Sequence, residues 1–295
     1  MSQPFQAVVY VNGRISDAST ASVPVFDHGF LYGEGVYETL RTYHQEPFLF
    51  DRHLRRLRRS ADMMALRVPF SDEECLERVC DTMGHLPGPG EKYIRILLTR
   101  GVGELSYKLE ACPTPTLVII VKPLDTPPER TFRDGVTVAL VGIRRNHPQA
   151  LNPMIKSNNL LNLALAMQEA YSRGADEALM QNQAGELVEC SQSNFFLVRN
   201  GGLLTPPLSA GLLPGITREF VMELAKDASV ATAETRLTPA DLDSAHEAFL
   251  TGTTREITPV VSVDGRPIGS GRPGALTERL LASFRDRVAS LVGAR

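Results

Sequence analysis

The sequence has few cysteines and no long apolar run, and its positive and negative charges nearly balance. Its four cysteines show no C-x-x-C spacing and no histidine partners at metal-ligand distance, so we expect reduced, mostly buried thiols and no metal site. No apolar run approaches the roughly 18 residues that a membrane-spanning helix needs. The net charge of -3 gives no reason to expect nucleic acid or an anionic membrane as a partner.

The first residues of the chain show no pattern typical of a secretion signal. Met1 to Gln6 contains no charged stretch followed by an apolar one, which a secretion signal requires. The composition is that of an ordinary globular protein, with 43% hydrophobic and 22% charged residues. These features together predict a cytoplasmic protein.

A length of 295 residues suits one large or two medium domains. The best linker candidate is 122–133, which holds three prolines. Strand-like and helix-like patterns occur on both sides of it. We therefore predict an α/β fold of the α+β type with a smaller N-terminal domain over 1–121, a linker over 122–133 and a larger C-terminal domain over 134–295.

Two elements of the N-terminal part carry polar groups of interest. A helical pattern from Asp51 has an apolar stripe on one face and five arginines on the other, most of which we expect to be solvated: Arg52, Arg55, Arg56, Arg58 and Arg59. The run Tyr93–Thr99 is typical of a strand, and strand alternation puts Tyr93 and Arg95 on one face.

One lysine, Lys156, follows an apolar, proline-containing approach and precedes a helical run from Leu160 to Arg173. Packing of its stem against Met154 and Ile155 would remove solvent, and desolvation favours the neutral amine that a Schiff base with an aldehyde requires. Taken alone, a lysine in such a place is more often an ordinary surface residue.

Three downstream features suit an anionic, aromatic cofactor. Gly215-Ile216-Thr217 begins a helix, where unpaired N–H groups and the helix dipole favour a phosphate. Gly252-Thr253-Thr254 is a second turn rich in donors. Glu189 lies on an otherwise apolar strand and must find a partner, which either a protonated pyridine nitrogen or a structural arginine would provide.

The order and spacing of several motifs are specific, although each motif alone is weak. Together they strongly resemble the class IV, fold-type IV, pyridoxal-phosphate aminotransferases, which include branched-chain and D-amino-acid aminotransferases. The resemblance extends from about Val9 to Gly265. The motifs are Asp27-His28-Gly29, Glu38, His53-x-x-Arg56-Leu57, Lys156-Ser157, Glu189-x-Ser191-x-Ser193-Asn194, Leu213-Pro214-Gly215-Ile216-Thr217 and Gly252-Thr253-Thr254-x-Glu256.

The resemblance implies roles for individual residues. Lys156 would carry pyridoxal 5'-phosphate (PLP) as an internal aldimine and then move the substrate proton. Glu189 would pair with the pyridine nitrogen, and Leu213 would pack against the ring. The phosphate would be bound by Arg56, Ile216, Thr217 and Thr253. The residues implied for the substrate are Tyr32, Tyr37, Arg41, Tyr93, Arg95, Thr253 and Thr254.

The resemblance also implies a two-domain fold with the cofactor between the domains, and a homodimer in which a partner loop helps to close each substrate pocket. The activity it implies is transfer of an amino group between an amino acid and 2-oxoglutarate or another keto acid. From the charge balance we expect no nucleic-acid partner and no membrane partner.

The choice of substrate rests on conflicting features. Tyr93, Arg95 and Arg41 resemble branched-chain aminotransferases, and the loop after Gly101 lacks the Arg-x-His carboxylate trap of the D-amino-acid enzymes. Against this, Leu160 stands where branched-chain enzymes usually have a tyrosine. We favour a branched-chain L-amino acid. The alternatives are a D-amino-acid aminotransferase, then an (R)-amine transaminase or an aminodeoxychorismate lyase, and last a non-catalytic vitamin B6 carrier.

Overall fold

The computed structural model describes residues 6–293, and the expectation made for Met1 to Gln6 therefore concerns residues that, except for Gln6, lie outside the described part. The chain divides into two compact units. Unit 1 contains the described residues up to Asp125 together with Ile155–Asn159, and unit 2 contains Thr126–Met154 and the residues from Leu160 onward. Between residues 6 and 293, no helix is long and apolar enough to cross a bilayer.

The division differs in detail from the one expected from the sequence. The chain leaves unit 1 within 122–133, but strand β6 (Thr116–Pro123) extends into this segment, and a short helix, α4 (Glu129–Asp134), lies at its far end. The segment Ile155–Asn159 belongs to unit 1 because its backbone pairs with strand β3 (Gly35–Tyr43), through the bridge between Val36 and Ser157. Sequence patterns do not reveal such a return, because the segment is too short to show a period.

Unit 1 is built on a six-stranded sheet in the order β2-β1-β6-β5-β3-β4, in which every paired neighbour is antiparallel. Alternating apolar residues form its long central strands. The strands are β1 (Val8–Val11), β2 (Arg14–Asp17), β3 (Gly35–Tyr43), β4 (Glu46–Pro47), β5 (Lys92–Thr99) and β6 (Thr116–Pro123).

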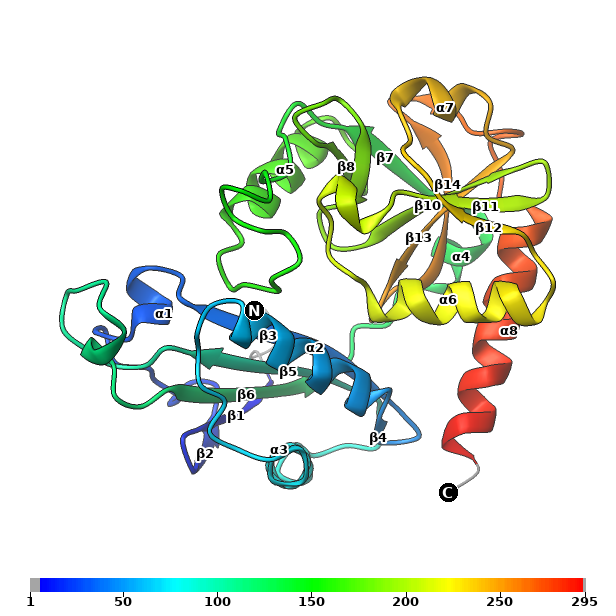
Figure 1. The fold of residues 1–295 in the computed structure, drawn as a ribbon. Helices are drawn as coiled ribbons and strands as arrows, with labels where there is room; N and C mark the ends of the chain where they lie inside the picture. Colours follow the sequence, from blue (N-terminus) through cyan, green and yellow to red (C-terminus); the bar gives the residue numbers. More distant parts are fainter. Residues whose placement is uncertain (1–5, 294–295) are drawn as a thin grey trace. The chain divides into compact units, whose positions relative to one another are not determined.

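Two helices, α2 (Phe50–Asp62) and α3 (Asp72–Gly84), pack on one face of this sheet (Figure 1). The buried stripe of α2 is the predicted one, with Leu54, Leu57 and Ala61 at 1% exposure or less. Alternate residues of β3 and β5 point into this core, so their other neighbours, Tyr37 and Arg95 among them, lie on the opposite face. Unit 1 also contains α1 (His28–Leu31) and a short 3-10 turn, η1 (Leu109–Ala111).

Unit 2 is built on a nine-stranded sheet that closes on itself. Its order is β12-β11-β10-β13-β14-β7-β8-β9, β15 pairs with β14, and β9 pairs again with β10 through Glu189 and Asn194. The strands are β7 (Val136–Leu140), β8 (Glu177–Gln181), β9 (Leu187–Cys190), β10 (Asn194–Arg199), β11 (Gly202–Thr205), β12 (Thr232–Glu234), β13 (Glu247–Gly252), β14 (Glu256–Val263) and β15 (Arg266–Pro267).

The helices of unit 2 pack on this sheet. Helix α5 (Leu161–Ser172) contacts β8, while α6 (Ile216–Asp227) and α8 (Ala275–Val292) pack on β13 and on each other (Figure 1). Phe220 and Phe284 meet edge to face between α6 and α8, with centroids 5.5 Å apart. The remaining elements are η2 (Leu208–Ala210) and α7 (Pro239–Asp243).

Candidate active site

Lys156 is held by its backbone on the edge of β3. Its carbonyl accepts from the N–H of Tyr37 at 2.9 Å, and its N–H donates to the hydroxyl of Ser60 at 3.1 Å. Two residues further on, the N–H of Asn158 donates to the carbonyl of Gly35 at 3.0 Å. The main chain is therefore fixed on both sides of the lysine, and its side chain alone is left to move.

The side chain of Lys156 lies against an aromatic ring. Its Nζ is 4.6 Å from the ring centroid of Tyr37, and Cζ of Arg95 is 4.0 Å from the same centroid. A ring face attracts cations, because its electron density is concentrated above and below the plane. Tyr37 thus contacts both the amine of Lys156 and the guanidinium of Arg95.

The predicted substrate residues of unit 1 gather on one face of the sheet. Tyr37, Thr39 and Arg41 alternate along β3, and the register places Arg41 opposite Tyr93 and Thr39 opposite Arg95. This face carries positive charge and hydroxyl groups on an otherwise apolar strand pair. Arg41 itself is buried, with Cζ 4.0 Å from the ring centroid of Tyr43.

Tyr32 is the exception among those residues. It follows α1, and its ring meets His28 edge to face with centroids 4.8 Å apart and lies 5.2 Å from the ring of Tyr107. Through Tyr107 it touches the loop 101–112. The structure therefore places Tyr32 with that loop.

Arg56 is the one buried member of the five arginines on α2. Its Nε donates to Oε1 of Glu38 and its Nη2 to Oε2, each at 2.7 Å. His53, one turn earlier, shares Oε2 of the same carboxylate at 2.7 Å. The expectation that most of these arginines are solvated is confirmed, because the other four are exposed or half-buried. Glu38 is the partner of Arg56 that sequence reasoning did not assign.

Burial by itself would raise the pKa of Glu38, but the adjacent Arg56 and His53 outweigh it and lower the pKa to about 2. The pKa of His53 is lowered, first by burial, which its attraction to Glu38 only partly offsets, and further by the nearby charges of Arg56 and Lys156. The triad therefore combines a firmly ionised carboxylate with a histidine that resists protonation.

In unit 2, Glu189 receives three donors. Its Oε1 accepts from Nε of Arg145 at 2.8 Å, and its Oε2 accepts from the N–H of Leu213 at 3.0 Å and the amide of Asn194 at 3.3 Å. The structural arginine considered from the sequence is thus present. A carboxylate oxygen has two lone pairs, so Oε1 can still accept from a protonated pyridine nitrogen. The residue fits the role expected for it.

Leu213 leads directly into the predicted phosphate site. Helix α6 begins at Ile216 after Gly215, which makes no side-chain cap, so the N–H groups of Ile216 and Thr217 start the helix without intrahelical acceptors. A Cβ on Gly215 would lie 1.9 Å from Oδ1 of Asn194, so the close approach requires glycine. The first turn of α6 therefore fits a phosphate.

The turn between β13 and β14 holds Thr253 and Thr254. The N–H of Arg255 donates to the carbonyl of Gly252 at 3.1 Å and closes it. Within residues 6–293, the N–H groups of Thr253 and Thr254 have no hydrogen-bond acceptor. Both groups can therefore donate to an anion, and the binding of one at this turn stays a prediction.

The cysteines follow their expected pattern. All four are free, and Cys75, Cys112 and Cys190 are buried while Cys80 is exposed. Burial raises the pKa of Cys190, the residue after Glu189, well above its ordinary value. This thiol is an apolar neighbour of the site and no nucleophile. Between residues 6 and 293 no cluster of metal-ligating side chains exists.

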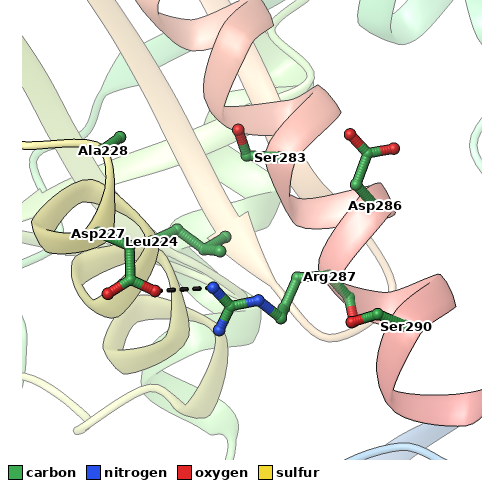
Figure 2. A pocket seen from close by; sticks show the side chains of 7 residues that line it. All are labelled: Leu224, Asp227, Ala228, Ser283, Asp286, Arg287 and Ser290. Atoms are coloured by element: carbon green, nitrogen blue, oxygen red, sulfur yellow. Dashed lines mark hydrogen bonds and ion pairs between the residues drawn. The ribbon is translucent and has the colours of Figure 1, made fainter. Parts of the chain in front are cut away.

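A pocket of about 450 Å³ lies between α6 and α8 (Figure 2). Asp227 and Arg287 line it and form an ion pair of 2.7 Å, and two serines and Asp286 complete the polar lining. None of the predicted site residues lines it. Its polar, open walls make it a surface groove separate from the candidate site.

Comparison with known proteins matches residues 35–263 to the model of the family "Amino-transferase class IV". The chain is 40% identical to a protein of Methanocaldococcus jannaschii with a provisional name as a branched-chain-amino-acid aminotransferase, over 94% of this chain and 95% of that one. It is 31% identical to a D-alanine aminotransferase of Bacillus licheniformis, over 96% of this chain and 97% of that one.

Solved structures give the same result for the fold. The branched-chain aminotransferase of Thermoproteus uzoniensis, solved with norvaline, superposes with a TM-score of 0.89 at 34% identity, covering 96% of this chain and 95% of that one. The branched-chain amino acid aminotransferase of T.th., solved with pyridoxamine 5'-phosphate, also reaches 0.89, at 29% identity, covering 98% of this chain and 96% of that one. That enzyme has also been solved with 4-methylvaleric acid.

Proposed function

Because this chain belongs to the class IV aminotransferases, we propose that it moves an amino group from a branched-chain L-amino acid to 2-oxoglutarate or another keto acid. The protein is a PLP-dependent transaminase with the two-domain fold-type IV architecture. When bound, PLP withdraws electrons from the substrate Cα and stores the amino group between the two half-reactions.

The observation that carries the proposal is the contact of Tyr37 with both Lys156 and Arg95. A transaminase must hold the substrate carboxylate at a fixed distance from the base that moves its proton. One ring that touches the base and a guanidinium provides that fixed spacing. Lys156 would carry the cofactor, accept the Cα proton on Nζ and return it to the other side of the C=N bond.

Glu189 and Arg56 would bind the two ends of the same cofactor. Glu189 would hold a proton on the pyridine nitrogen, and Arg145, paired with it at 2.8 Å, would keep the carboxylate oriented. Arg56 would contribute positive charge to the phosphate, together with Thr253 and the N–H groups of Ile216 and Thr217. Leu213, whose backbone is fixed by Glu189 at 3.0 Å, would pack on the ring.

The basic face of the unit 1 sheet suits a keto acid with two carboxylates. Arg95 and Arg41 lie on it with Tyr93, whose hydroxyl is 3.4 Å from that of Thr39. Arginine binds carboxylates in a planar, bidentate geometry, and the tyrosine hydroxyl adds an uncharged hydrogen-bond donor. We infer that this face, together with Thr253 and Thr254, orients the substrate carboxylates, while its aromatic surfaces accept a branched aliphatic side chain.

A D-amino-acid substrate is the second candidate, favoured by the 31% identity to a D-alanine aminotransferase. The loop 101–112 offers Lys108 as an exposed cation for a carboxylate in that case. The same loop is held by His28, whose Nε2 donates to the carbonyl of Glu104 at 2.8 Å. A fixed loop with one cation is a weaker carboxylate site than the two arginines of the sheet face, so we place this candidate second.

A homodimer is part of the proposal. Two adjacent segments of unit 1 expose large apolar side chains, with Phe30 73%, Leu105 68% and Tyr107 85% accessible. The segments are joined by the bridge between Asp27 and Val102. Large exposed apolar side chains on neighbouring segments are typical of an interface between subunits. Light scattering should give twice the chain mass, and Phe30→Glu with Leu105→Glu should give monomers.

The proposed substrate can be tested by absorbance. The purified protein, loaded with PLP, is mixed with L-leucine or D-alanine without a keto acid, and conversion to the pyridoxamine form is followed. Fast conversion by L-leucine alone supports the proposal. Conversion by D-alanine alone would favour the second candidate, and a response to neither would direct attention to amines and aminodeoxychorismate.

A further inference from the structure

The turn that joins β13 to β14 contains a strained residue. Glu256 has a φ of 53°, a left-handed conformation that side chains other than glycine and asparagine adopt at an energetic cost. Glu256 follows Thr253, Thr254 and Arg255 in the chain. Within residues 6–293, the N–H groups of the two threonines face no protein acceptor. Strain of this kind persists only where the surroundings enforce it.

An arginine from the last helix supports Glu256. Nε of Arg285 on α8 donates to Oε2 of Glu256 at 2.9 Å, and the Glu256 residue is 6% exposed. Arg285 also lies over the ring of Phe132, with its Cζ 4.7 Å from the ring centroid. Its Nη2 is 3.8 Å from Oε1 of Glu129. The guanidinium is thus fixed by α4 while it holds the carboxylate, and the carboxylate in turn fixes the end of the turn.

A second ion pair anchors the other side of the turn. Nη1 of Arg255 lies 3.0 Å from Oε2 of Glu177, a carboxylate with no exposed surface. The hydroxyls of Ser191 and Ser193 also donate to Glu177. The hydroxyl of Thr258 donates to the carbonyl of Arg255 at 2.7 Å. The turn is therefore tied to β8 at one residue and to α8 at the next.

We propose that Arg285 is a positioning residue for the active site: by pairing with Glu256 it holds this turn in the strained shape that presents the N–H groups of Thr253 and Thr254 to the substrate carboxylate. The inference rests on the proposed function, because it assumes that the turn binds that anion. Arg285 touches neither substrate nor cofactor in this scheme. It acts through the backbone of Glu256.

Arg287 provides a matched control on the same helix. Both arginines have side chains 42% exposed, and Arg287 pairs with Asp227 at 2.7 Å (Figure 2), away from the turn. Loss of either guanidinium removes one positive charge from α8, together with the ion pairs to Glu256 and Glu129 for Arg285 and the ion pair to Asp227 for Arg287. Only Arg285→Ala should affect the turn.

The test measures binding of 4-methylvaleric acid to the PLP-loaded protein by calorimetry, alongside KM and kcat for L-leucine. Arg285→Ala should weaken 4-methylvaleric acid binding about tenfold or more and raise KM more than it lowers kcat, because a mispositioned turn costs carboxylate binding. Arg287→Ala should leave both within about twofold, a change too small to indicate a lost contact. Arg285→Ala should melt at a lower temperature than Arg287→Ala, because it takes this arginine from a buried carboxylate, so binding is measured well below both melting temperatures.

A rescue variant separates positioning from general damage. Glycine adopts a φ of 53° without penalty, so Glu256→Gly removes both the strain and the buried carboxylate. The double variant Glu256→Gly with Arg285→Ala should then recover most of the affinity that Arg285→Ala loses. Because Glu256→Gly also removes the buried charge, recovery of affinity is compared at a temperature at which every variant is folded.

Three results would overturn the inference. Equal affinities of Arg285→Ala, Arg287→Ala and the wild type for 4-methylvaleric acid would show that the turn needs no support from α8. In that case the proposed function would still hold, provided that the wild type binds 4-methylvaleric acid and converts L-leucine. Failure of the double variant to recover would show that Arg285 does not act by enforcing the conformation of Glu256. A wild-type protein that neither binds 4-methylvaleric acid nor converts L-leucine would refute the proposed function, and the inference with it.

Discussion

Inside unit 1, the carboxylate of Glu38 accepts two hydrogen bonds from the guanidinium of Arg56, each with a donor–acceptor distance of 2.7 Å. The carboxylate has no exposed surface, and the arginine has 4%. Water cannot compensate either charge at such a site, so each charge depends on the other. The same pair also determines where Arg56 is held, which links the stability of unit 1 to the residue proposed for the cofactor phosphate.

Glu38→Gln should destabilise the protein by about 3–5 kcal/mol, because it leaves the buried guanidinium without its counter-charge. Urea unfolding followed by circular dichroism measures the change. Asp51→Asn is the matched control, since Asp51 pairs with Arg55 on the same helix at 2.9 Å with both side chains 68% exposed. Exposed pairs contribute little, so the control should change stability by less than about 1 kcal/mol. Equal effects of the two variants would contradict the role given to burial.

Acid should destabilise the wild type through the same group. The pKa of Glu38 is lowered from 4.5 to about 2 in the folded protein, so the unfolded chain binds the proton more readily. The stabilisation is complete above pH 4.5 and is lost as the pH falls toward 2, by roughly 3 kcal/mol in total. The lowered pKa of His53 acts in the same direction, below its ordinary value of 6.5.

The measurement is the free energy of unfolding as a function of pH for the wild type and Glu38→Gln. The variant should show a flatter slope between pH 4.5 and 2, because the titrating group is gone. Parallel curves for the two proteins would mean that other carboxylates cause the acid sensitivity.

The positions of Lys156 and Arg56 illustrate what the sequence could predict. Local patterns predicted the strand that carries Tyr93 and Arg95 and the helix that carries Arg56, and the structure confirms both of them. These features depend on neighbouring residues and on a short period. The family followed from the ordered motifs, and the comparisons confirm it.

Long-range pairing was not predictable in the same way. The return of Ile155–Asn159 to β3 and the pairing of Glu189 with Arg145, 44 residues apart, depend on the whole fold. A carboxylate on an apolar strand signals that a partner exists without identifying it. Glu38 was visible as a charged residue in a strand between Tyr37 and Thr39, and that signal should have led to Arg56.

Glu189→Gln should slow turnover by about tenfold to a hundredfold while the cofactor remains bound, because a neutral amide holds the pyridine proton less well than a carboxylate does. Stopped-flow absorbance of the half-reaction with L-leucine measures this rate. Glu186→Gln, four residues before β9 ends, is the control, since Glu186 pairs with an exposed arginine, Arg236. An unchanged rate in Glu189→Gln with bound cofactor would refute the role of this carboxylate.

Arg95→Gln should raise KM for 2-oxoglutarate by about tenfold to a hundredfold, since a charge-assisted hydrogen bond to a carboxylate contributes roughly 1.5–3 kcal/mol. The control is Lys122→Gln, which removes a positive charge from the neighbouring strand, opposite Tyr93. Steady-state kinetics with both substrates distinguish the two. A KM that rises equally in both variants would indicate a general electrostatic effect and no specific contact of Arg95.

Lys156→Ala should lower the rate of transamination by at least about 10²–10⁴-fold, because no other group can take the position of the lysine amine. The fold should survive, because the two hydrogen bonds that fix this segment use the backbone of residue 156 and alanine keeps them. They are the bond from the N–H of Tyr37 and the bond to the hydroxyl of Ser60. Absorbance after dialysis should show that the covalently held cofactor is lost, and circular dichroism should match the wild type. Substitution of Lys92, a buried lysine on β5 that donates to Gln45, tests whether any buried lysine of unit 1 has the same effect. Turnover in Lys156→Ala close to that of the wild type would refute the assignment of the reactive amine and, with it, the shared contact of Tyr37 as the basis of the site.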